Sequence, residues 1–384
     1  MGDVSSTDLF VFWFVVGLRL FVPLLIPRYP LPAVIAALVI DGIDQTVFQT
    51  FTSLPLDGYQ GYDKALDIYY LTIAYISTLR NWTNIAAFQV SRFLFYWRLI
   101  GVAALELIHW RPLLMIFPNT FEYFFIFYEA VCLRWDPRRM SKRVVIGAAA
   151  FIWIFIKLPQ EYWIHIAQMD ATDFIKVNIF GMTTDAPWTE VIGQNLGAWL
   201  AALVVVVVLL LLARYVIKNM LPPPDWSMSF DADAHKSLPS LEQLRAYFEA
   251  QVGSVISWAL VEKIVMIGLV TLIFAQILPN IDGTNWQVLT AVAIVIFLNA
   301  VVSHWLAKRG VGWESAAREF VAMAVVNSGI VLLYAWLAPF TAQDLNLGNT
   351  LFFIYLLTVL VVLYDRYQPV HEARFAGAEE AAAA

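Results

Sequence analysis

The sequence has few charged residues and almost no cysteine. Only 14% of its 384 residues are charged, whereas an ordinary soluble domain carries about 25%, so the chain cannot cover a water-soluble surface of its size. The single cysteine, Cys132, excludes an intrachain disulfide and a cysteine metal cluster. The net charge of −6 offers no basic field for nucleic acid, which we do not expect as a partner.

The sequence motifs of several enzyme classes are also missing. The chain contains no P-loop, no G-x-G-x-x-G and no G-x-S-x-G. Its five histidines form no pair at the i+3 or i+4 spacing, which removes the support for a haem or a histidine metal site. We therefore expect neither ATP-driven nor dinucleotide chemistry within this chain, and we predict no cofactor.

Apolar segments dominate what remains, with 60% hydrophobic residues and a mean hydropathy of +0.69. A helix needs about 20 apolar residues to cross a bilayer. The candidate segments lie near residues 8–26, 31–53, 64–80, 85–108, 112–133, 143–163, 191–217, 255–278, 286–307, 316–338 and 349–366. The pattern predicts an all-α polytopic integral membrane bundle with about 10–11 transmembrane helices.

The orientation follows from arginine and lysine in short loops, which favour the cytoplasmic side. The richest loop carries Arg134, Arg138, Arg139, Lys142 and Arg143. Placing this loop in the cytoplasm puts the C-terminus there as well, in what we expect to be the bacterial cytoplasmic membrane. The N-terminus is then outside if all segments cross. It is inside if segment 31–53, which Asp41 and Asp44 interrupt, only re-enters the membrane.

Consecutive prolines divide the chain, because Pro222, Pro223 and Pro224 cannot continue the preceding helix. We predict a front transmembrane bundle with a polar pocket at 1–218 and a cytoplasmic proline-rich linker with an interfacial amphipathic helix at 219–252. A rear four-helix transmembrane part at 253–368 and a flexible tail at 369–384 complete the chain.

Polar residues gather in the second to fourth segments, where ionisable side chains are costly and usually face a cavity or a partner. The candidate set for binding an ion, a proton or a substrate is Asp41, Asp44, Gln45, Gln49, Asp63, Asp67, Gln89 and Arg92. Asp41, Gln45 and Gln49 follow helical i, i+4, i+8 spacing. We expect one shared pocket, with Arg92 as the countercharge of the acids.

Three roles remain open for this pocket. It could fix helix packing, couple transport to protonation or cation binding, or hold Mg²⁺ or Mn²⁺ through its carboxylates. For the third role, the spacing of Asp41, Asp44, Gly58, Asp63 and Asp67 is distantly similar to the signature of the CDP-alcohol phosphotransferases. That resemblance implies two metals that hold a lipid-linked diphosphate. The sequence departs from the signature, because the glycine after the second aspartate is Gln45 and the gap from Gly58 to Asp63 is one residue too long.

Secondary candidates lie elsewhere in the chain. Glu161 and His165 share a helical face in the sixth segment, and Glu262 and Lys263 are neighbours that we expect to pair with other helices. Asn299 and His304 lie along the ninth segment.

Our leading prediction is a multi-spanning transporter-like protein that moves a small solute or ion, coupled to protonation or cation binding at the aspartates. The alternatives are a membrane-embedded enzyme acting on a lipid-linked phosphate, either a metal-dependent phosphotransferase or a polyprenyl-sugar glycosyltransferase, and a structural subunit of a membrane assembly. The expected partners are the lipid bilayer, the transported or lipid-linked substrate and, through oligomerisation, further copies or other membrane subunits.

Overall fold

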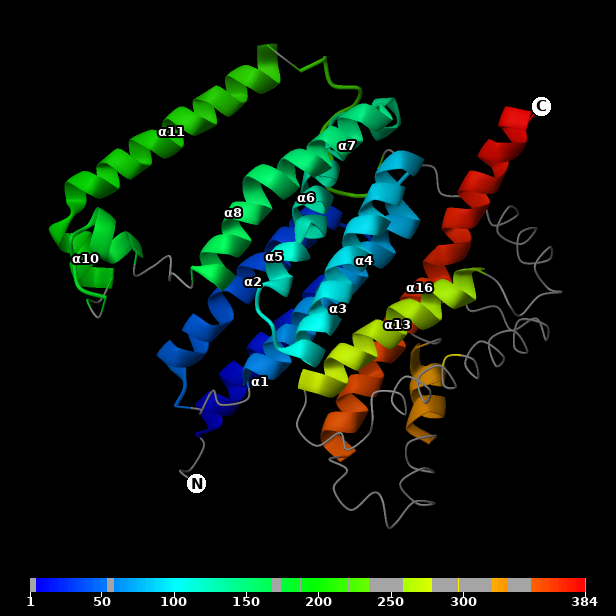
Figure 1. Cartoon of the computed structure of the whole chain (residues 1–384), viewed down its shortest axis with the longest axis horizontal. Helices are drawn as coiled ribbons and strands as arrows, with labels where there is room; N and C mark the ends of the chain where they lie inside the picture. The colour runs from blue at the N-terminus through cyan, green and yellow to red at the C-terminus, as the bar shows by residue number, and fades with distance from the viewer. Residues whose placement is uncertain are drawn as a thin grey trace.

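A computed structural model describes residues 5–53, 59–167, 174–184, 186, 188–219, 221–234, 258–277, 296, 320–329 and 347–383. Every regular element in these residues is helical, as Figure 1 shows, which confirms the predicted all-α class. The α-helices are α1 (Ser6–Phe21), α2 (Pro30–Phe51), α3 (Tyr59–Asn81), α4 (Ile85–Ile108), α5 (Leu113–Ile116), α6 (Thr120–Cys132), α7 (Lys142–Phe151), α8 (Leu158–Glu161), α10 (Trp188–Gln194), α11 (Leu196–Asn219), α13 (Trp258–Ile277) and α16 (Leu347–Ala383).

Six helical segments in this part of the chain are long and apolar enough to cross a membrane: Ser6–Leu25, Pro30–Phe51, Lys142–Ile166, Leu196–Val216, Trp258–Gln276 and Leu351–Phe375. The predicted segment 31–53 is one continuous helix, because α2 runs through both Asp41 and Asp44 without a break. The expected segment at 112–133 is instead divided into α5 and α6. The expected span at 286–307 and the amphipathic helix of the 219–252 linker lie outside the described residues, apart from Ile296.

Local sequence signals account for where the first helices begin and end. Ser5 caps α1 by accepting a hydrogen bond from the Asp8 N–H, while the Asp8 carboxylate accepts one from the Ser5 N–H. Asn84 caps α4 by accepting one hydrogen bond from the Ala87 N–H. At the other end of α4, His109 adopts φ 58°, a left-handed conformation that stops the helix.

One irregular helix joins α7 and α8. Residues Lys142–Ile166 form a continuous apolar rod, but the π-helical segments η3 (Ile152–Lys157) and η4 (Tyr162–Ile166) interrupt its α-helical bonding. Pro159 lies between them and has no N–H to donate. Wide turns of this kind often occur at functional sites, and each of these carries a polar residue, Lys157 or His165, that contacts Glu161.

The core lies around α3, which packs against α2, α4, α13 and α16. Aromatic side chains fill it, with Tyr75 stacked on Phe95 at a centroid distance of 4.3 Å and Trp82 stacked on Tyr128 at 3.8 Å. Buried residues of the front and rear parts form a single cluster. In contrast, α11 lies apart from this bundle in Figure 1, and its apolar stretch Leu196–Val216 has no buried residue.

One end of the bundle is rich in basic side chains. The loops at residues 26–29, 82–84 and 133–141 meet there, because Asn81 donates to the Pro27 carbonyl and Asn84 donates to the carbonyls of Pro137 and Met140. We call this end the basic face. Its cationic residues are Arg28, Arg80, Arg134, Arg138, Arg139, Lys142, Arg143 and Arg374.

Candidate functional site

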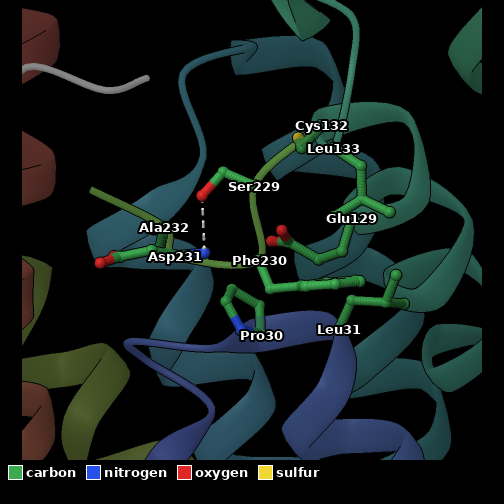
Figure 2. A pocket seen from close by; sticks show the side chains of 9 residues that line it. All are labelled: Pro30, Leu31, Glu129, Cys132, Leu133, Ser229, Phe230, Asp231 and Ala232. Atoms are coloured by element: carbon green, nitrogen blue, oxygen red, sulfur yellow. Dashed lines mark hydrogen bonds between the residues drawn. The ribbon is translucent and has the colours of Figure 1, made fainter. Parts of the chain in front are cut away.

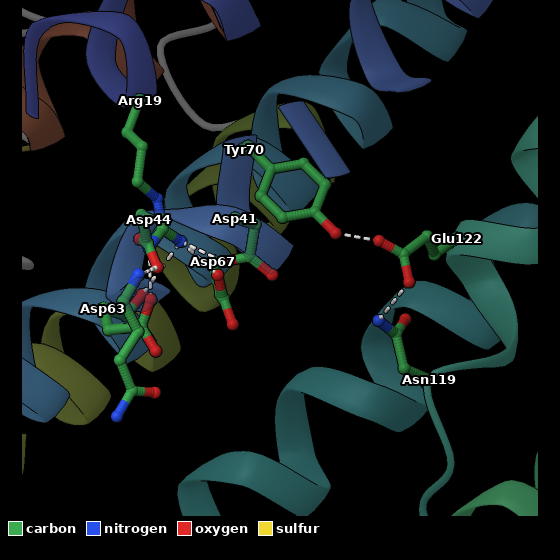
Figure 3. Close-up of polar contacts among 9 residues, drawn as sticks. Arg19, Asp41, Asp44, Asp63, Asp67, Tyr70, Asn119 and Glu122 are labelled. Carbon is green, nitrogen blue, oxygen red and sulfur yellow. Dashed lines mark hydrogen bonds and ion pairs between the residues drawn. The ribbon is translucent and has the colours of Figure 1, made fainter. Parts of the chain in front are cut away.

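The candidate site is a buried arginine surrounded by four aspartates (Figure 3). Arg19 comes from the last turn of α1. Asp41 and Asp44 come from the second half of α2, and Asp63 and Asp67 come from the first turns of α3. We call these five residues the Arg19 centre.

The guanidinium of Arg19 divides its hydrogen bonds between the two helices. Its Nη1 donates to Asp44 and Asp63, and its Nη2 donates to Asp41 and to Asp67, the last at 2.5 Å. Nη2 also lies 3.4 Å from the Asp63 carbonyl oxygen. A planar guanidinium presents its donors as a fixed fork, so Arg19 fixes the relative position of α1, α2 and α3.

Exposure divides the centre into an inner and an outer part. The side chains of Arg19 and Asp44 are each 3% exposed, while Asp41 is 26% exposed and Asp63 and Asp67 are each 38% exposed. The inner pair is therefore held away from solvent, whereas the outer carboxylates are partly accessible to it.

The formal charges of the Arg19 centre do not balance. Four carboxylates around one guanidinium leave three net negative charges when all are ionised. Neighbouring carboxylates in a poorly solvated site resist joint ionisation, so a proton or another cation bound at this centre would offset part of the excess charge.

The same carboxylates supply the oxygen ligands that hard divalent cations prefer. One oxygen each of Asp41, Asp44 and Asp63 lies within 4.8 Å of the others. Arg19 already donates to all three carboxylates. A metal ion bound here would therefore compete with the guanidinium for the same oxygens.

The prediction that Arg92 is the countercharge of the aspartates was wrong. Arg92 lies 3.3 Å from Glu262 of α13, and its side chain is 49% exposed. Arg19 holds the role that the sequence analysis gave to Arg92. An arginine within the first apolar span needs an anionic partner, and that requirement alone was a signal for Arg19.

The predicted amides do not join the centre. The residues buried beside Asp41 on α2 are Asp44 and Phe48, whereas Gln45 and Gln49 are exposed, and Gln89 of α4 is exposed as well. The i, i+4 spacing from Asp41 therefore marked the wrong stripe of the helix.

A second polar group lies beside the Arg19 centre (Figure 3). Tyr70, one turn after Asp67 on α3, donates its hydroxyl to the buried carboxylate of Glu122. The Asn119 side chain donates to the other oxygen of Glu122 at 3.1 Å, and the Asn119 backbone N–H donates to Glu161 at 3.2 Å. This chain of contacts links α3 and α6 to the irregular helix.

Glu161 and His165 meet as their spacing predicts. His165 Nε2 lies 3.0 Å from Glu161, and Lys157 Nζ lies 3.8 Å from the same carboxylate. Glu161 and Lys157 are buried, while the His165 side chain is 25% exposed. A buried acid that contacts a lysine and a histidine side chain is a satisfied arrangement, so it supports the irregular helix without requiring a ligand.

Glu262 and Lys263 pair with different helices, as expected from their positions on neighbouring faces. Glu262 accepts hydrogen bonds from Tyr75 and, at 3.3 Å, from Tyr96. Lys263 donates to Asp365 of α16 at 2.7 Å. These contacts fasten α13 to α3, α4 and α16. The remaining candidates, Asn299 and His304, lie outside the described residues.

Comparison with known proteins adds no assignment. No protein-family model matches the chain, and searches of the curated proteins and of the solved structures found no match either. The findings establish a multi-span helical membrane protein with a buried aspartate cluster.

Proposed function

We propose that this protein is a transporter of a cell membrane, and that the Arg19 centre couples the movement of a small solute or ion to the binding of a proton or another cation. The supporting observation is the charge imbalance around Arg19, where three α-helices contribute one cation and four acids. An anchor or a packing contact needs only a balanced pair, since excess buried charge costs several kcal/mol.

Protonation provides a physical switch at this centre. A proton on Asp67 converts a charged acceptor of Arg19 into a neutral one, which weakens the bond between α1 and α3. Loss of the proton restores it. Binding that favours one of two helix arrangements shifts their populations by the difference in affinity, and this is how an ion gradient would drive conformational change.

The orientation belongs to the same proposal. The positive-inside rule places the basic face in the cytoplasm. Asp63 and Asn81 lie near opposite ends of α3, about 27 Å apart at the usual helical rise. The Arg19 centre then lies toward the external side of a bacterial cytoplasmic membrane, with the N-terminus outside.

Ion flux into proteoliposomes tests the coupling role. A potassium diffusion potential imposed with valinomycin supplies the driving force, and an entrapped pH-sensitive dye reports proton entry. We expect D41N, D44N and D67N each to reduce the flux roughly tenfold, the factor that corresponds to about 1.4 kcal/mol. D365N is the matched control, because Asp365 pairs with Lys263 away from the centre. Unchanged flux in all three centre variants would refute the proposal.

A second candidate is a metal-dependent enzyme that transfers a phosphate-linked group to or from a lipid. It is favoured by the proximity of the Asp41, Asp44 and Asp63 oxygens. Titration calorimetry with Mg²⁺ and Mn²⁺ separates the two functions. Saturable binding that D44N removes would support the enzyme, whereas proton flux without metal binding would support the transporter.

A further inference from the structure

Four exposed cations lie at the ends of two membrane helices, on the side of the basic face. Lys142 and Arg143 belong to the first turn of α7, where one apolar span begins. Arg214 and Lys218 belong to the last turns of α11, where another apolar span ends. All four side chains are exposed. Charges at the ends of membrane spans lie at the level of the lipid headgroups.

The loop after α11 is fixed to the loop before α7. Trp135 Nε1 donates to the Pro222 carbonyl at 2.9 Å. The Asp225 N–H donates to the Arg134 carbonyl at 2.9 Å, and the Asp225 carboxylate accepts a hydrogen bond from the Asp136 N–H at 2.8 Å. Figure 1 shows the C-terminal end of α11 and the N-terminal end of α7 at the same end of the molecule. The two pairs of cations therefore lie on the same side of the membrane.

The chain that follows this loop continues across the basic face. The Ala232 N–H donates to the Arg28 carbonyl at 2.9 Å, which holds residues 229–232 near the start of α2. Figure 2 shows the pocket that remains between this segment, Pro30 and Leu133. Its space is sufficient for little more than a water molecule. A lipid headgroup does not fit there, in contrast to the exposed ends of α7 and α11.

The acids of the basic face are already paired with other cations. The pairs are Asp136 with Arg138, Asp225 with Arg139, Asp231 with Arg28, and Asp233 with Arg28 and Arg80. Within the part of the chain that the structure describes, Lys142, Arg143, Arg214 and Lys218 have no acidic partner. We call these four residues the unpaired cations. Their counterions come from outside the described residues.

Apolar surface begins directly beside the unpaired cations. Val144, which follows Arg143, is 53% exposed, and the apolar stretch of α11 has no buried residue. Tyr215, which follows Arg214, is also exposed, and tyrosine is enriched at the boundary between membrane and water. A ligand that matches both features has an anionic head and apolar chains. A phospholipid has this chemistry, whereas a soluble acidic protein supplies only the charge.

The first turn of α7 adds to the attraction for a phosphate group. Ser141 caps this helix by accepting a hydrogen bond from the Val144 N–H at 3.4 Å. The N–H groups of a first helical turn have no acceptor within the helix. Together with the positive end of the helix dipole, they favour an anion. This contribution acts at the same place as the side chains of Lys142 and Arg143.

We propose that the unpaired cations bind the phosphate groups of anionic phospholipids, whose acyl chains lie against the exposed faces of α7 and α11. Phosphatidylglycerol keeps the negative charge of its phosphate, whereas phosphatidylcholine cancels that charge with a cationic group. The surface therefore selects lipids by charge. Each lysine or arginine near an anionic membrane surface contributes about fivefold to affinity. Lipid binding at this surface does not require the proposed transport function.

Native mass spectrometry measures this selection. The purified full-length protein is equilibrated in a nonionic detergent with equal amounts of phosphatidylglycerol and phosphatidylcholine that carry the same acyl chains. The masses of the complexes give the ratio of the two bound lipids. We expect wild type to favour phosphatidylglycerol. The variants K142Q/R143Q and R214Q/K218Q should each lower the ratio, by about fivefold for each cation removed.

The matched control is R28Q/R138Q. It also removes two exposed cations from the basic face, but both are already paired with aspartates, so we expect the lipid ratio to change little. All variants should unfold at the wild-type temperature in lipid-free detergent within a few degrees, because every replaced side chain is exposed. An equal lipid ratio in wild type, or the same loss in R28Q/R138Q as in the two test variants, would overturn the proposal.

Salt and soluble competitors identify the occupant of the surface. Added chloride should lower the wild-type ratio, because exposed charges are screened. Glycerol phosphate has the anionic head without acyl chains, and we expect it not to displace phosphatidylglycerol at equal concentration. Displacement by glycerol phosphate would indicate a site for a free phosphate group. A glutamate-rich peptide that binds in place of the lipid would indicate a surface for an acidic protein. Either result would overturn the proposal.

Discussion

Replacing Arg19 by glutamine tests how the bundle tolerates its buried acids. The substitution removes the cation that donates to Asp41, Asp44, Asp63 and Asp67. Removing one partner of a buried ion pair costs roughly 3–5 kcal/mol. We expect a decrease of that size in the free energy of unfolding of R19Q, which corresponds to roughly a hundredfold to a few thousandfold in the folded-to-unfolded ratio.

The pH dependence of this effect has a defined sign. In R19Q the four acids repel one another when ionised, so acidification should reduce the defect. In wild type, Arg19 already offsets part of this repulsion, so the same protons bind with a smaller gain in stability. The two stability profiles should therefore converge as the buffer changes from mildly alkaline to mildly acidic.

The assay is thermal unfolding in detergent, followed by the fraction of protein that remains monodisperse in size-exclusion chromatography. R28Q is the matched control, because Arg28 also pairs with two aspartates but is 51% exposed, and we expect a much smaller loss of stability than in R19Q. The double variant R19Q/D44N should recover part of the R19Q loss. Equal stability of R19Q and R28Q at neutral pH would refute the account of the centre.

Three further predictions concern other parts of the chain. The hydrogen bonds from Arg138 hold the pKa of Asp136 below its usual value. The contribution of Asp136 to stability is therefore present at neutral pH and is lost as the pH falls through that lowered pKa. D136N should reduce the fall of the melting temperature at acidic pH in a series of thermal-unfolding measurements. Ala in place of Gly101 should destabilise by about 1–3 kcal/mol, because its Cβ would collide with Phe117, whereas G147A meets no atom within 4 Å and should not decrease the melting temperature. E262L should make α13 more susceptible to limited proteolysis, because it removes the group that accepts from Tyr75 and pairs with Arg92. E262Q keeps a hydrogen-bond acceptor, so its α13 should be cleaved more slowly than that of E262L.

The sequence predicted the helical membrane class and the proximity of the four aspartates because both depend on local patterns. Apolar length marks spans, and costly intramembrane acids indicate shared surroundings. Asp41, Asp44, Asp63 and Asp67 accordingly meet around one cation.

The partner of the acids could not be chosen from the same patterns. Arg19 and Arg92 both lie in apolar helices, and the choice between them depends on how distant helices pack. Arg92 pairs with Glu262, which lies far along the chain. A similar limit explains Gln45 and Gln49, because a lipid-facing stripe and a core-facing stripe are both apolar in a membrane helix. The contact of Glu122 with Tyr70 joins α6 to α3 and has no local signature.

Infrared spectroscopy of the purified protein at neutral pH reports whether the Arg19 centre holds a proton, because protonated carboxyl groups have a carbonyl stretch that ionised carboxylates lack. The charge imbalance around Arg19 predicts such a band in wild type, a decrease in D67N and D41N, and no change in D365N. The role assigned to the Arg19 centre would be contradicted if D67N and D41N left this band unchanged and if the centre bound no other cation instead of a proton.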